Sequence, residues 1–381
     1  MTMTANAKNS SAWTDSTLPA PLALESALTG ARTTIMDPRR WQKAKAAYTT
    51  RHVAGELADR PRDLYLVTGD GVVPRPGDVA VARVAEIGQH ARLEGPGSRR
   101  QLLFPGDEIV VAYGHRYAPD QYEAYVPNDL GLTNLVAAGG VIGTVTTRHA
   151  KMDPATTVQP LGLLADDQGL LTLSRCAPLA VREDLPPAGK APVLAVLGTS
   201  MNAGKSLGLA CLVRGLTAAG LTVAAGKATG TGAGGDPRLF TDAGAARVLD
   251  FTDFGLPSTY RLDHSAARRL LGSLVAELAG PGVDVTVVEV ADGVYQDETA
   301  RLLADPLFGT LIDGVVFAAA DALGAVAGVA VLREAGVDVR AVSGLLTAAP
   351  LGAREAAAQL DVPVIDTYDL CDPDVARSLL R

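Results

Sequence analysis

Cysteine is scarce in this sequence, and its few cysteines lie far apart. Among 381 residues only Cys176, Cys211 and Cys371 carry a thiol, and no two of them form a Cys-x-x-Cys pair. This spacing argues against a disulfide framework and against a zinc knuckle, and it favours a reducing compartment. We therefore expect a cytoplasmic protein.

Long apolar runs and an excess of positive charge are also missing. No stretch approaches the roughly 20 apolar residues of a membrane span, and residues 1–21 lack the apolar centre of a signal peptide, so we expect a disordered leader there. The formal net charge of −8 argues against a general nucleic-acid partner. The expected partners are a small-molecule substrate and other copies of the chain in a homo-oligomer, with neither nucleic acid nor a membrane.

Aromatic residues make up only 4% of the chain, whereas 48% of its residues are hydrophobic, many of them Ala, Val and Leu. Small aliphatic side chains of this kind suit closely packed layers of helices and strands. The length is sufficient for two ordinary domains. The sequence therefore predicts an α/β protein with two parts.

The first predicted domain spans residues 22–185 and is rich in β-structure. Residues 22–62 have helical character, and after them short β-type runs are bounded by Gly, Pro and Asp. Two near-identical turns, Pro76-Gly77-Asp78 and Pro105-Gly106-Asp107, each precede such a run. This spacing is typical of a small β-barrel or sandwich. The segment Pro186-Pro187-Ala188-Gly189 is the predicted linker to the second domain.

The second predicted domain, residues 191–381, alternates apolar runs with helical stretches. The expected strands are 193–197, 221–225, 285–290, 315–319, 339–345 and 362–365, and the expected helices are 206–219, 265–278, 322–334 and 353–360. Strands that alternate with helices indicate a parallel, doubly wound sheet. The ligands of such sheets bind at the carboxyl ends of the strands.

A glycine-containing segment follows the first of these strands and leads into the first helix. It reads Gly198-Thr-Ser-Met-Asn-Ala-Gly204-Lys205-Ser206 and ends in the Gly-Lys-Ser of a phosphate-binding loop, with Thr199 in the slot of the usual first glycine. Backbone N–H groups at a helix start attract anions, Lys205 adds positive charge, and the Ser206 hydroxyl suits Mg²⁺. The predicted phosphate-binding residues are Thr199, Asn202, Ala203, Gly204, Lys205 and Ser206.

Three further charged residues follow later strands or open a helix. Glu289 ends an apolar strand, where a carboxylate needs a partner, so we favour metal binding there. Asp242 is either a helix-start residue or a metal ligand. Lys227 is either a surface lysine or a phosphate contact beside the loop. We predict Lys205 and Lys227 as catalytic residues, and Ser206, Asp242 and Glu289 as Mg²⁺ ligands.

Other polar residues are candidates for contacts with a substrate. The segment Thr229-Gly-Thr-Gly-Ala-Gly-Gly235 is either a mobile linker or a loop that orders over a substrate. Asp236 and Asp292 are either substrate contacts or turn residues. His115 and Arg116 are either anion-recognising residues or part of an exposed loop. The predicted substrate contacts are Thr229, Thr231, Asp236, Asp292, His115 and Arg116.

The second domain resembles dethiobiotin synthetase and its P-loop relatives, which include the cobyrinate amidases, over about 190 residues. The segment from Gly198-Thr199 to Gly204-Lys205-Ser206 is similar to their Gly-Thr-x-x-x-x-Gly-Lys-Thr. Lys227 stands where that family has a catalytic lysine. Phe240-Thr241-Asp242-Ala243 and Val287-Val288-Glu289 are similar to the elements that carry the family's Mg²⁺-binding Asp and Glu.

The sequence also departs from that family. Glu289-Val-Ala-Asp292-Gly293 replaces the family's Glu-Gly-Ala-Gly-Gly, and Lys227-Ala228 replaces its Lys-Pro, so dethiobiotin synthesis itself is not expected. The two-part layout and the segment Asp250-Phe-Thr-Asp-Phe-Gly-Leu-Pro-Ser-Thr-Tyr260 resemble more closely a two-domain P-loop family of largely unknown function. Some of its members are similar to N-acetyltransferases that act on D-glutamate, which implies acetyl-CoA as a cofactor.

The sequence predicts an ATP- and Mg²⁺-dependent enzyme of kinase or ligase type, which activates a small carboxylate or related oxyanion by phosphoryl transfer. The first alternative is a CoA-dependent N-acyltransferase that acts on an amino acid and binds acetyl-CoA. The second alternative is a nucleotide-gated switch protein, although the chain lacks the Asn-Lys-x-Asp sequence that recognises guanine.

Overall fold

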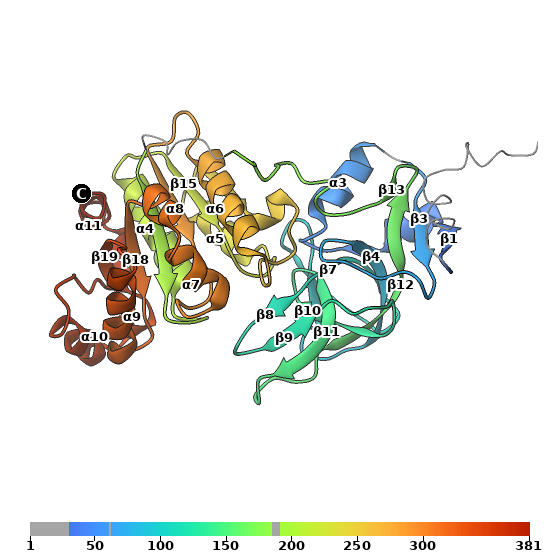
Figure 1. Cartoon of the computed structure of the whole chain (residues 1–381), viewed down its shortest axis with the longest axis horizontal. Helices are drawn as coiled ribbons and strands as arrows, with labels where there is room; N and C mark the ends of the chain where they lie inside the picture. The colour runs from blue at the N-terminus through green and yellow to red at the C-terminus, as the bar shows by residue number, and fades with distance from the viewer. Residues whose placement is uncertain (1–29, 61, 185–190) are drawn as a thin grey trace, which may run out of the picture.

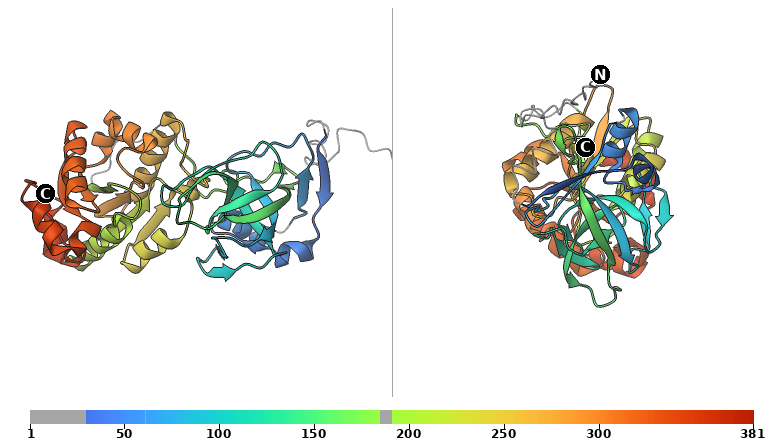
Figure 2. Two further views of the ribbon diagram at one scale, coloured as in Figure 1. Left: turned by 90° about the horizontal axis from the view of Figure 1, so that it is seen from below. Right: turned by 90° about the vertical axis from the view of Figure 1, so that its right-hand side faces the viewer.

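The computed structural model of the protein describes residues 30–60, 62–184 and 191–381. The predicted leader, the beginning of the predicted helical segment and the predicted linker lie outside these ranges. A β-rich part and an α/β part follow one another along the long axis of the molecule (Figures 1 and 2). Their buried apolar side chains form separate clusters, so each part has a core of its own.

Five strands of the β-rich part pair in a closed ring. They are β12 (Thr156–Asp166), β4 (Val79–Glu86), β7 (Glu108–Tyr113), β11 (Val141–Arg148) and β10 (Thr133–Ala137), and β10 pairs again with β12. The pairing of β7 with β11 is parallel, and the other four are antiparallel. Side chains from all five strands meet in one buried apolar cluster, which holds the ring together.

Shorter elements extend this ring. The strands are β1 (Arg32–Ile35), β2 (Lys45–Ala46), β3 (Tyr65–Thr68), β5 (Arg92–Glu94), β6 (Arg100–Leu102), β8 (Arg116–Tyr117), β9 (Tyr122–Tyr125) and β13 (Gly169–Leu170), and the helices are α2 (Pro38–Lys43) and α3 (Arg51–Asp59). The predicted helical segment thus contains two helices, but also β1 and β2. The β-branched run Thr33-Thr34-Ile35 favours an extended chain, which explains β1.

The α/β part contains a six-stranded, all-parallel sheet. Its order is β16 (Arg247–Asp250), β15 (Val223–Lys227), β17 (Val285–Glu289), β14 (Val193–Gly198), β18 (Gly314–Ala318) and β19 (Val339–Ser343). The predicted parallel sheet is confirmed. The expected strand 362–365 is only an isolated bridge, in which Val364 pairs with Val342 at the sheet edge. The sequence analysis missed β16, whose four residues are too few and too polar to form an apolar run.

Helices cover both faces of this sheet. Those on one face are α4 (Lys205–Ala218), α5 (Gly235–Asp242) and α11 (Pro373–Ser378), and those on the other are α6 (His264–Leu278), α7 (Asp297–Leu303), α8 (Pro306–Leu311), α9 (Ala322–Glu334) and α10 (Pro350–Ala357). The two apolar cores therefore sandwich the strands, as in a doubly wound fold. Within the described ranges, no helix combines the length and the apolar character needed to cross a membrane.

The core of the α/β part begins upstream of the predicted boundary. Leu179 and Val181 pack against the core cluster of that part, although both precede residue 191. The backbone N–H of Arg182 donates to the Ser273 hydroxyl on α6 at 2.9 Å. Residues 179–182 therefore contribute to the C-terminal core.

We predict that a fragment that starts at Ala177 is more stable than one that starts at Ala191. The longer fragment retains the apolar contacts of Leu179 and Val181, which at half burial are worth roughly 2 kcal/mol together. Urea unfolding of both fragments, followed by circular dichroism, measures the difference. Equal free energies of unfolding would show that residues 177–190 do not contribute to the C-terminal core.

Candidate functional site

The predicted phosphate-binding loop connects the central strand β14 to α4. Gly204, just before α4, has a φ of +100°, and a Cβ there would lie 3.0 Å from both Gly344 Cα and Leu345 N, so only glycine fits without strain. Asn202 also has a positive φ, +62°, which asparagine tolerates better than most residues. The N–H of Leu345 donates to the Ala203 carbonyl at 2.9 Å. The loop is therefore braced from behind by the segment that follows β19.

Lys205 folds back over this loop. Its Nζ donates to the Ser200 carbonyl at 2.8 Å, and the residue is only 6% exposed. Burial lowers the pKa of Lys205, whereas the nearby carboxylates of Glu289 and Asp292 oppose that shift. The ammonium group is thus poorly solvated and lies where an anion in the loop would neutralise it.

Lys227 is the centre of an ion cluster at the carboxyl end of the sheet. It stands opposite Glu289 in the register of β15 and β17, and its Nζ lies 3.1 Å from Glu289 Oε1. The same Nζ also contacts the carboxylate of Asp236, in the first turn of α5. Burial disfavours the charge on Lys227, but the two carboxylates outweigh it and raise the pKa of Lys227.

The two carboxylates of the cluster differ in how far their oxygens are satisfied by hydrogen bonds and ion pairs. Burial would raise the pKa of Asp236, but Lys227 and a hydrogen bond from the Ser206 hydroxyl hold it below its usual range. Glu289 is 1% exposed, and its Oε2 is buried without a hydrogen-bond partner among the described residues. A buried carboxylate oxygen without a partner is costly, so this oxygen needs a donor or a cation.

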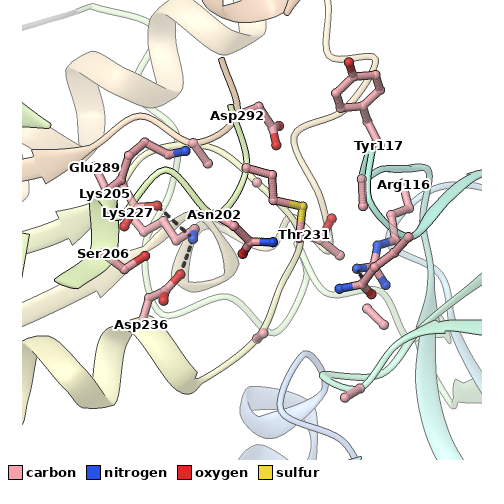
Figure 3. Close-up of a pocket in the computed structure, with 18 of the residues that line it drawn as sticks. Arg116, Tyr117, Asn202, Lys205, Ser206, Lys227, Thr231, Asp236, Glu289 and Asp292 are labelled. Atoms are coloured by element: carbon pink, nitrogen blue, oxygen red, sulfur yellow. Dashed lines mark hydrogen bonds and ion pairs between the residues drawn. The ribbon is translucent and has the colours of Figure 1, made fainter. Parts of the chain in front are cut away.

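A cavity of about 530 Å³ opens in front of these groups and extends to the β-rich part. Its C-terminal wall includes Lys205, Ser206, Lys227, Asp236, Glu289 and Asp292, and its N-terminal wall includes His90, Arg116, Tyr117 and Gln121. Figure 3 shows the lysine cluster on one side, Arg116 and Tyr117 on the other, and Asn202, Thr231 and Asp292 between them. The phosphate-binding loop therefore faces a space that both domains enclose.

The glycine-rich segment 229–235 is packed between the two domains. A Cβ on Gly139 of the β-rich part would lie 2.0 Å from the Gly232 carbonyl oxygen, so the two backbones are in direct contact. The N–H of Gly234 donates to the Glu94 carboxylate at 2.9 Å. The backbone of this segment thus lies against the β-rich part at the interface. Thr231 lines the cavity, and Thr229 is buried beside it, where its hydroxyl accepts from Ala291 N–H.

A second group of polar contacts joins the two domains, between the start of α3 and the end of β16. The Tyr48 hydroxyl donates to Asp250 at 2.8 Å, and Arg51 bonds Thr252 and Asp253, both at 2.6 Å. Burial and the charge of Asp250 raise the pKa of Tyr48, which stays protonated and remains a donor. These bonds involve Asp250, the last residue of β16, so the interface and the cavity are built from the same edge of the sheet.

The structure brings most of the predicted phosphate-binding residues to the cavity. Asn202, Gly204, Lys205 and Ser206 line it, whereas Thr199 and Ala203 do not. The Thr199 hydroxyl is buried without a partner among the described residues, and its methyl group packs near Gly324, so the side chain supports the loop from below. Ala203 is fully buried.

Two predicted site residues lie elsewhere. Asp242 is exposed at the end of α5 and does not line the cavity, because it lies six residues after Asp236, a rise of roughly 9 Å along the helix. Asp236, predicted as a substrate contact, takes the place beside Ser206 that we expected for Asp242. His115 does not line the cavity either; its Nδ1 accepts from Val126 N–H at 3.2 Å, and its ring packs edge-on against Tyr125.

Asp292 stands between the two walls of the cavity. Its φ is +66°, in the left-handed region that aspartate only occasionally adopts. Burial raises the pKa of Asp292 to about 6, although Lys205 and Lys227 pull it down. His90 and Gln121 complete the opposite wall and were missed by the sequence analysis, because nothing local in the sequence shows which loops of the first domain face the second.

Comparisons with known proteins find only distant likenesses. No family model and no curated protein matches the chain, so the resemblance to dethiobiotin synthetase and to the two-domain family is not supported. Solved structures that are similar include the signal recognition particle receptor FtsY of Elizabethkingia anophelis in complex with GDP, with 15% identity, coverage of 55% of this chain and 69% of that chain, and a TM-score of 0.36.

Two others are the cell division protein FtsY of Thermotoga maritima (16% identity, 55% and 74% coverage, TM-score 0.36) and the signal recognition particle 54 kDa protein of Aeropyrum pernix with GDP (19% identity, 54% and 50% coverage, TM-score 0.34). Likenesses with TM-scores this low carry no argument about activity. The description of the C-terminal part as a P-loop domain rests on its own parallel sheet and on the loop between β14 and α4.

We predict that Asp292→Asn stabilises the ligand-free chain at neutral pH and has little effect at pH 4. An acid whose pKa is raised to about 6 in the folded chain stabilises folding fully below its unfolded pKa and loses that contribution as the pH rises through 6. After a discount for partial exposure, the gain is roughly 2 kcal/mol at pH 7.5. Asparagine also tolerates a positive φ, so the substitution does not change the strain of the backbone at this position.

Urea unfolding of both proteins at pH 4, 6 and 7.5 checks this expectation. A difference between wild type and variant that does not change with pH would show that Asp292 is ionised at its ordinary pKa.

Proposed function

We propose that the chain is a nucleotide- and Mg²⁺-dependent enzyme that transfers a phosphoryl group to a small carboxylate or related oxyanion. The observation that carries the proposal is that the phosphate-binding loop and two lysines face a cavity enclosed by two domains. A space of about 530 Å³ beside the loop is large enough for a small acceptor molecule next to nucleotide phosphates.

The nucleotide's phosphates would lie at the start of α4. Backbone N–H groups at a helix N-terminus favour anions, and Lys205 is already next to them. The bond from Lys205 to the Ser200 carbonyl would be exchanged for one to a phosphate oxygen. Lys227 would contact the transferred phosphoryl group, because it is held on the cavity wall by Asp236 and Glu289.

The residues present fit a Mg²⁺ ion bound together with phosphates. Among the described residues, no group of three or more His, Cys, Asp or Glu side chains is placed to hold a metal alone. Mg²⁺ at nucleotide sites, however, uses one or two carboxylates, a hydroxyl and phosphate oxygens. Ser206, Asp236 and Glu289 meet this requirement, and the partnerless Oε2 of Glu289 is the oxygen that needs a cation. When bound, Mg²⁺ would neutralise charge on the phosphates.

A nucleotide-gated switch is the second candidate, and one contact favours it. The Asn202 amide, in the phosphate-binding loop, donates to the carboxylate of Asp120 in the β-rich part. A phosphate that reorders the loop would therefore alter a contact between the two domains. In an enzyme, the same contact would close the cavity when the nucleotide binds.

The test of nucleotide binding uses Lys205→Ala. Isothermal titration with ATP, GTP and acetyl-CoA, each with and without Mg²⁺, should show tight binding of a nucleoside triphosphate to the wild type. The variant should fold and lose roughly 10- to 100-fold in affinity, because it loses a charge-assisted bond to phosphate. Lys151→Ala, an exposed lysine of the β-rich part, is the matched control and should bind normally. Tight binding of acetyl-CoA alone would instead favour the acyltransferase.

A second prediction concerns Glu289→Gln. We expect this variant to reduce Mg²⁺-dependent phosphate release by roughly 100-fold while nucleotide affinity changes little, because a ligand of the ion is lost but the shape is kept. Asp242→Asn, which changes an exposed carboxylate on the same domain, should leave the rate unchanged. Phosphate release measured as a function of Mg²⁺ concentration tests whether Glu289 is a ligand of the ion. Equal release by Glu289→Gln and the wild type at every Mg²⁺ concentration would show that Glu289 does not hold the ion.

A further inference from the structure

We propose that Arg116 forms a second anion site in the cavity, which binds a carboxylate or phosphate group of the acceptor molecule. This inference rests on the proposed function, because it assumes that an acceptor shares the cavity with the nucleotide. It goes beyond that function in requiring that the acceptor carry a negative group other than the oxygen that reacts.

The guanidinium of Arg116 is buried without the partners that such a group requires. The residue is 6% exposed, and it lines the cavity from strand β8. Nη2 donates to the amide oxygen of Gln121 at 2.8 Å, whereas Nε and Nη1 have no hydrogen-bond partner among the described residues. Five N–H donors on one side chain thus have a single neutral acceptor.

No carboxylate of the described residues compensates this charge by direct contact. Asp120 and Asp292 favour the charged form only from a distance, and burial lowers the pKa of Arg116 to about 10. The guanidinium therefore remains charged at neutral pH. A buried charge without a counter-ion is strongly unfavourable, so an anionic ligand would gain from neutralising it.

The neighbouring histidine does not share this role. Burial and the charge of Arg116 lower the pKa of His90 to about 4, so His90 is neutral at physiological pH. Its Nδ1 is also buried without a partner among the described residues. Of the residues that line the N-terminal wall, Arg116 thus supplies the positive charge.

The opposite wall of the cavity carries carboxylates as well as lysines. There, Lys205 and Lys227 face Asp236, Glu289 and Asp292. Nucleotide phosphates and Mg²⁺ would join that cluster, whereas Arg116 lies on the other side of the cavity (Figure 3). An acceptor that spans the cavity can place its reacting oxyanion near the lysines only if its far end satisfies Arg116. A carboxylate or a phosphate can accept two bonds from a guanidinium and neutralise it, whereas a neutral acceptor leaves the charge uncompensated.

The experiment titrates the full chain with acetate and with inorganic phosphate by calorimetry. The protein is first saturated with Mg²⁺ and the non-hydrolysable β,γ-imido analogue of whichever nucleoside triphosphate it binds. The phosphate-binding loop is then filled and cannot bind the probe. We expect the wild type to bind at least one probe, and the comparison of the two distinguishes a carboxylate site from a phosphate site. We expect Arg116→Gln to weaken that binding at least about tenfold.

Arg148→Gln is the matched control, because Arg148 is an exposed arginine on β11, which β9 separates from β8 in the same sheet, and it lies outside the cavity. It should bind the probes as the wild type does. Arg116→Lys retains the charge but not the planar fork, and we expect intermediate affinity. If Arg116→Gln does not fold, Arg116→Lys decides the outcome: an affinity equal to that of the wild type overturns the proposal.

The same samples separate this inference from the proposed function. Nucleotide affinity of Arg116→Gln should equal that of the wild type. If the wild type binds no nucleotide, the proposed function fails, and the probes are then titrated against Lys205→Ala, in which the loop has lost its lysine. Binding that persists in Lys205→Ala and disappears when Arg116→Gln is added supports the anion site. Absence of probe binding to the wild type, or equal binding to Arg116→Gln, overturns it.

Discussion

A largely buried lysine must be matched by fixed negative charge, and in this protein that requirement organises the end of the sheet. Lys227 is held by Glu289 from the adjacent strand and by Asp236 from the helix that follows. These two ion pairs link β15, β17 and α5 at the carboxyl end of the sheet. The phosphate-binding loop lies beside this edge, so the charges that would receive a nucleotide are in place before it binds. Such preorganisation is what electrostatic stabilisation of phosphoryl transfer requires.

The ion pairs of Lys227 also affect the contact between the domains, because the segment between Lys227 and Asp236 lies at that contact. Since both of its ends are fixed by the ion cluster, the intervening glycines have little freedom, and they lie flat against Gly139 and Glu94 of the β-rich part. A side chain at Gly232 would collide with Thr49 and Thr252. The glycines therefore allow close contact between the two domains. This contact also closes one side of the cavity.

Features that are encoded by a short, contiguous segment could be predicted from the sequence. The Gly-Lys-Ser of the phosphate-binding loop is contiguous, and its strand and helix are strongly apolar. Glu289 and Lys227 could both be assigned to the site because parallel strands end at one edge of a sheet, but their ion pair was not predicted. Asp242 was misplaced because a short sequence match does not show where a helix begins: α5 starts at Gly235 and carries Asp242 away from the cavity.

The opposite wall was harder to foresee for a different reason. Its residues come from several strands and loops of the first domain, and their approach to the cavity depends on how two separate cores are docked. Arg116 was among the candidates because of its charge, but so was its neighbour His115. In the structure, His115 precedes β8 and packs against Tyr125, whereas Arg116 of β8 lines the cavity. The sequence alone does not show which of the two neighbours meets the second domain.

The charges explain why the cavity needs both domains. The C-terminal edge holds two lysines and three carboxylates. In the proposed function the phosphates and the cation would occupy these groups, which leaves no lysine for a second anion. The β-rich part adds one cation, Arg116, whose Nε and Nη1 have no partner among the described residues. Because this guanidinium is itself buried, it favours a charged acceptor over a neutral one, since only an anion offsets the cost of its burial. We infer that the first domain selects the acceptor, while the second binds the nucleotide.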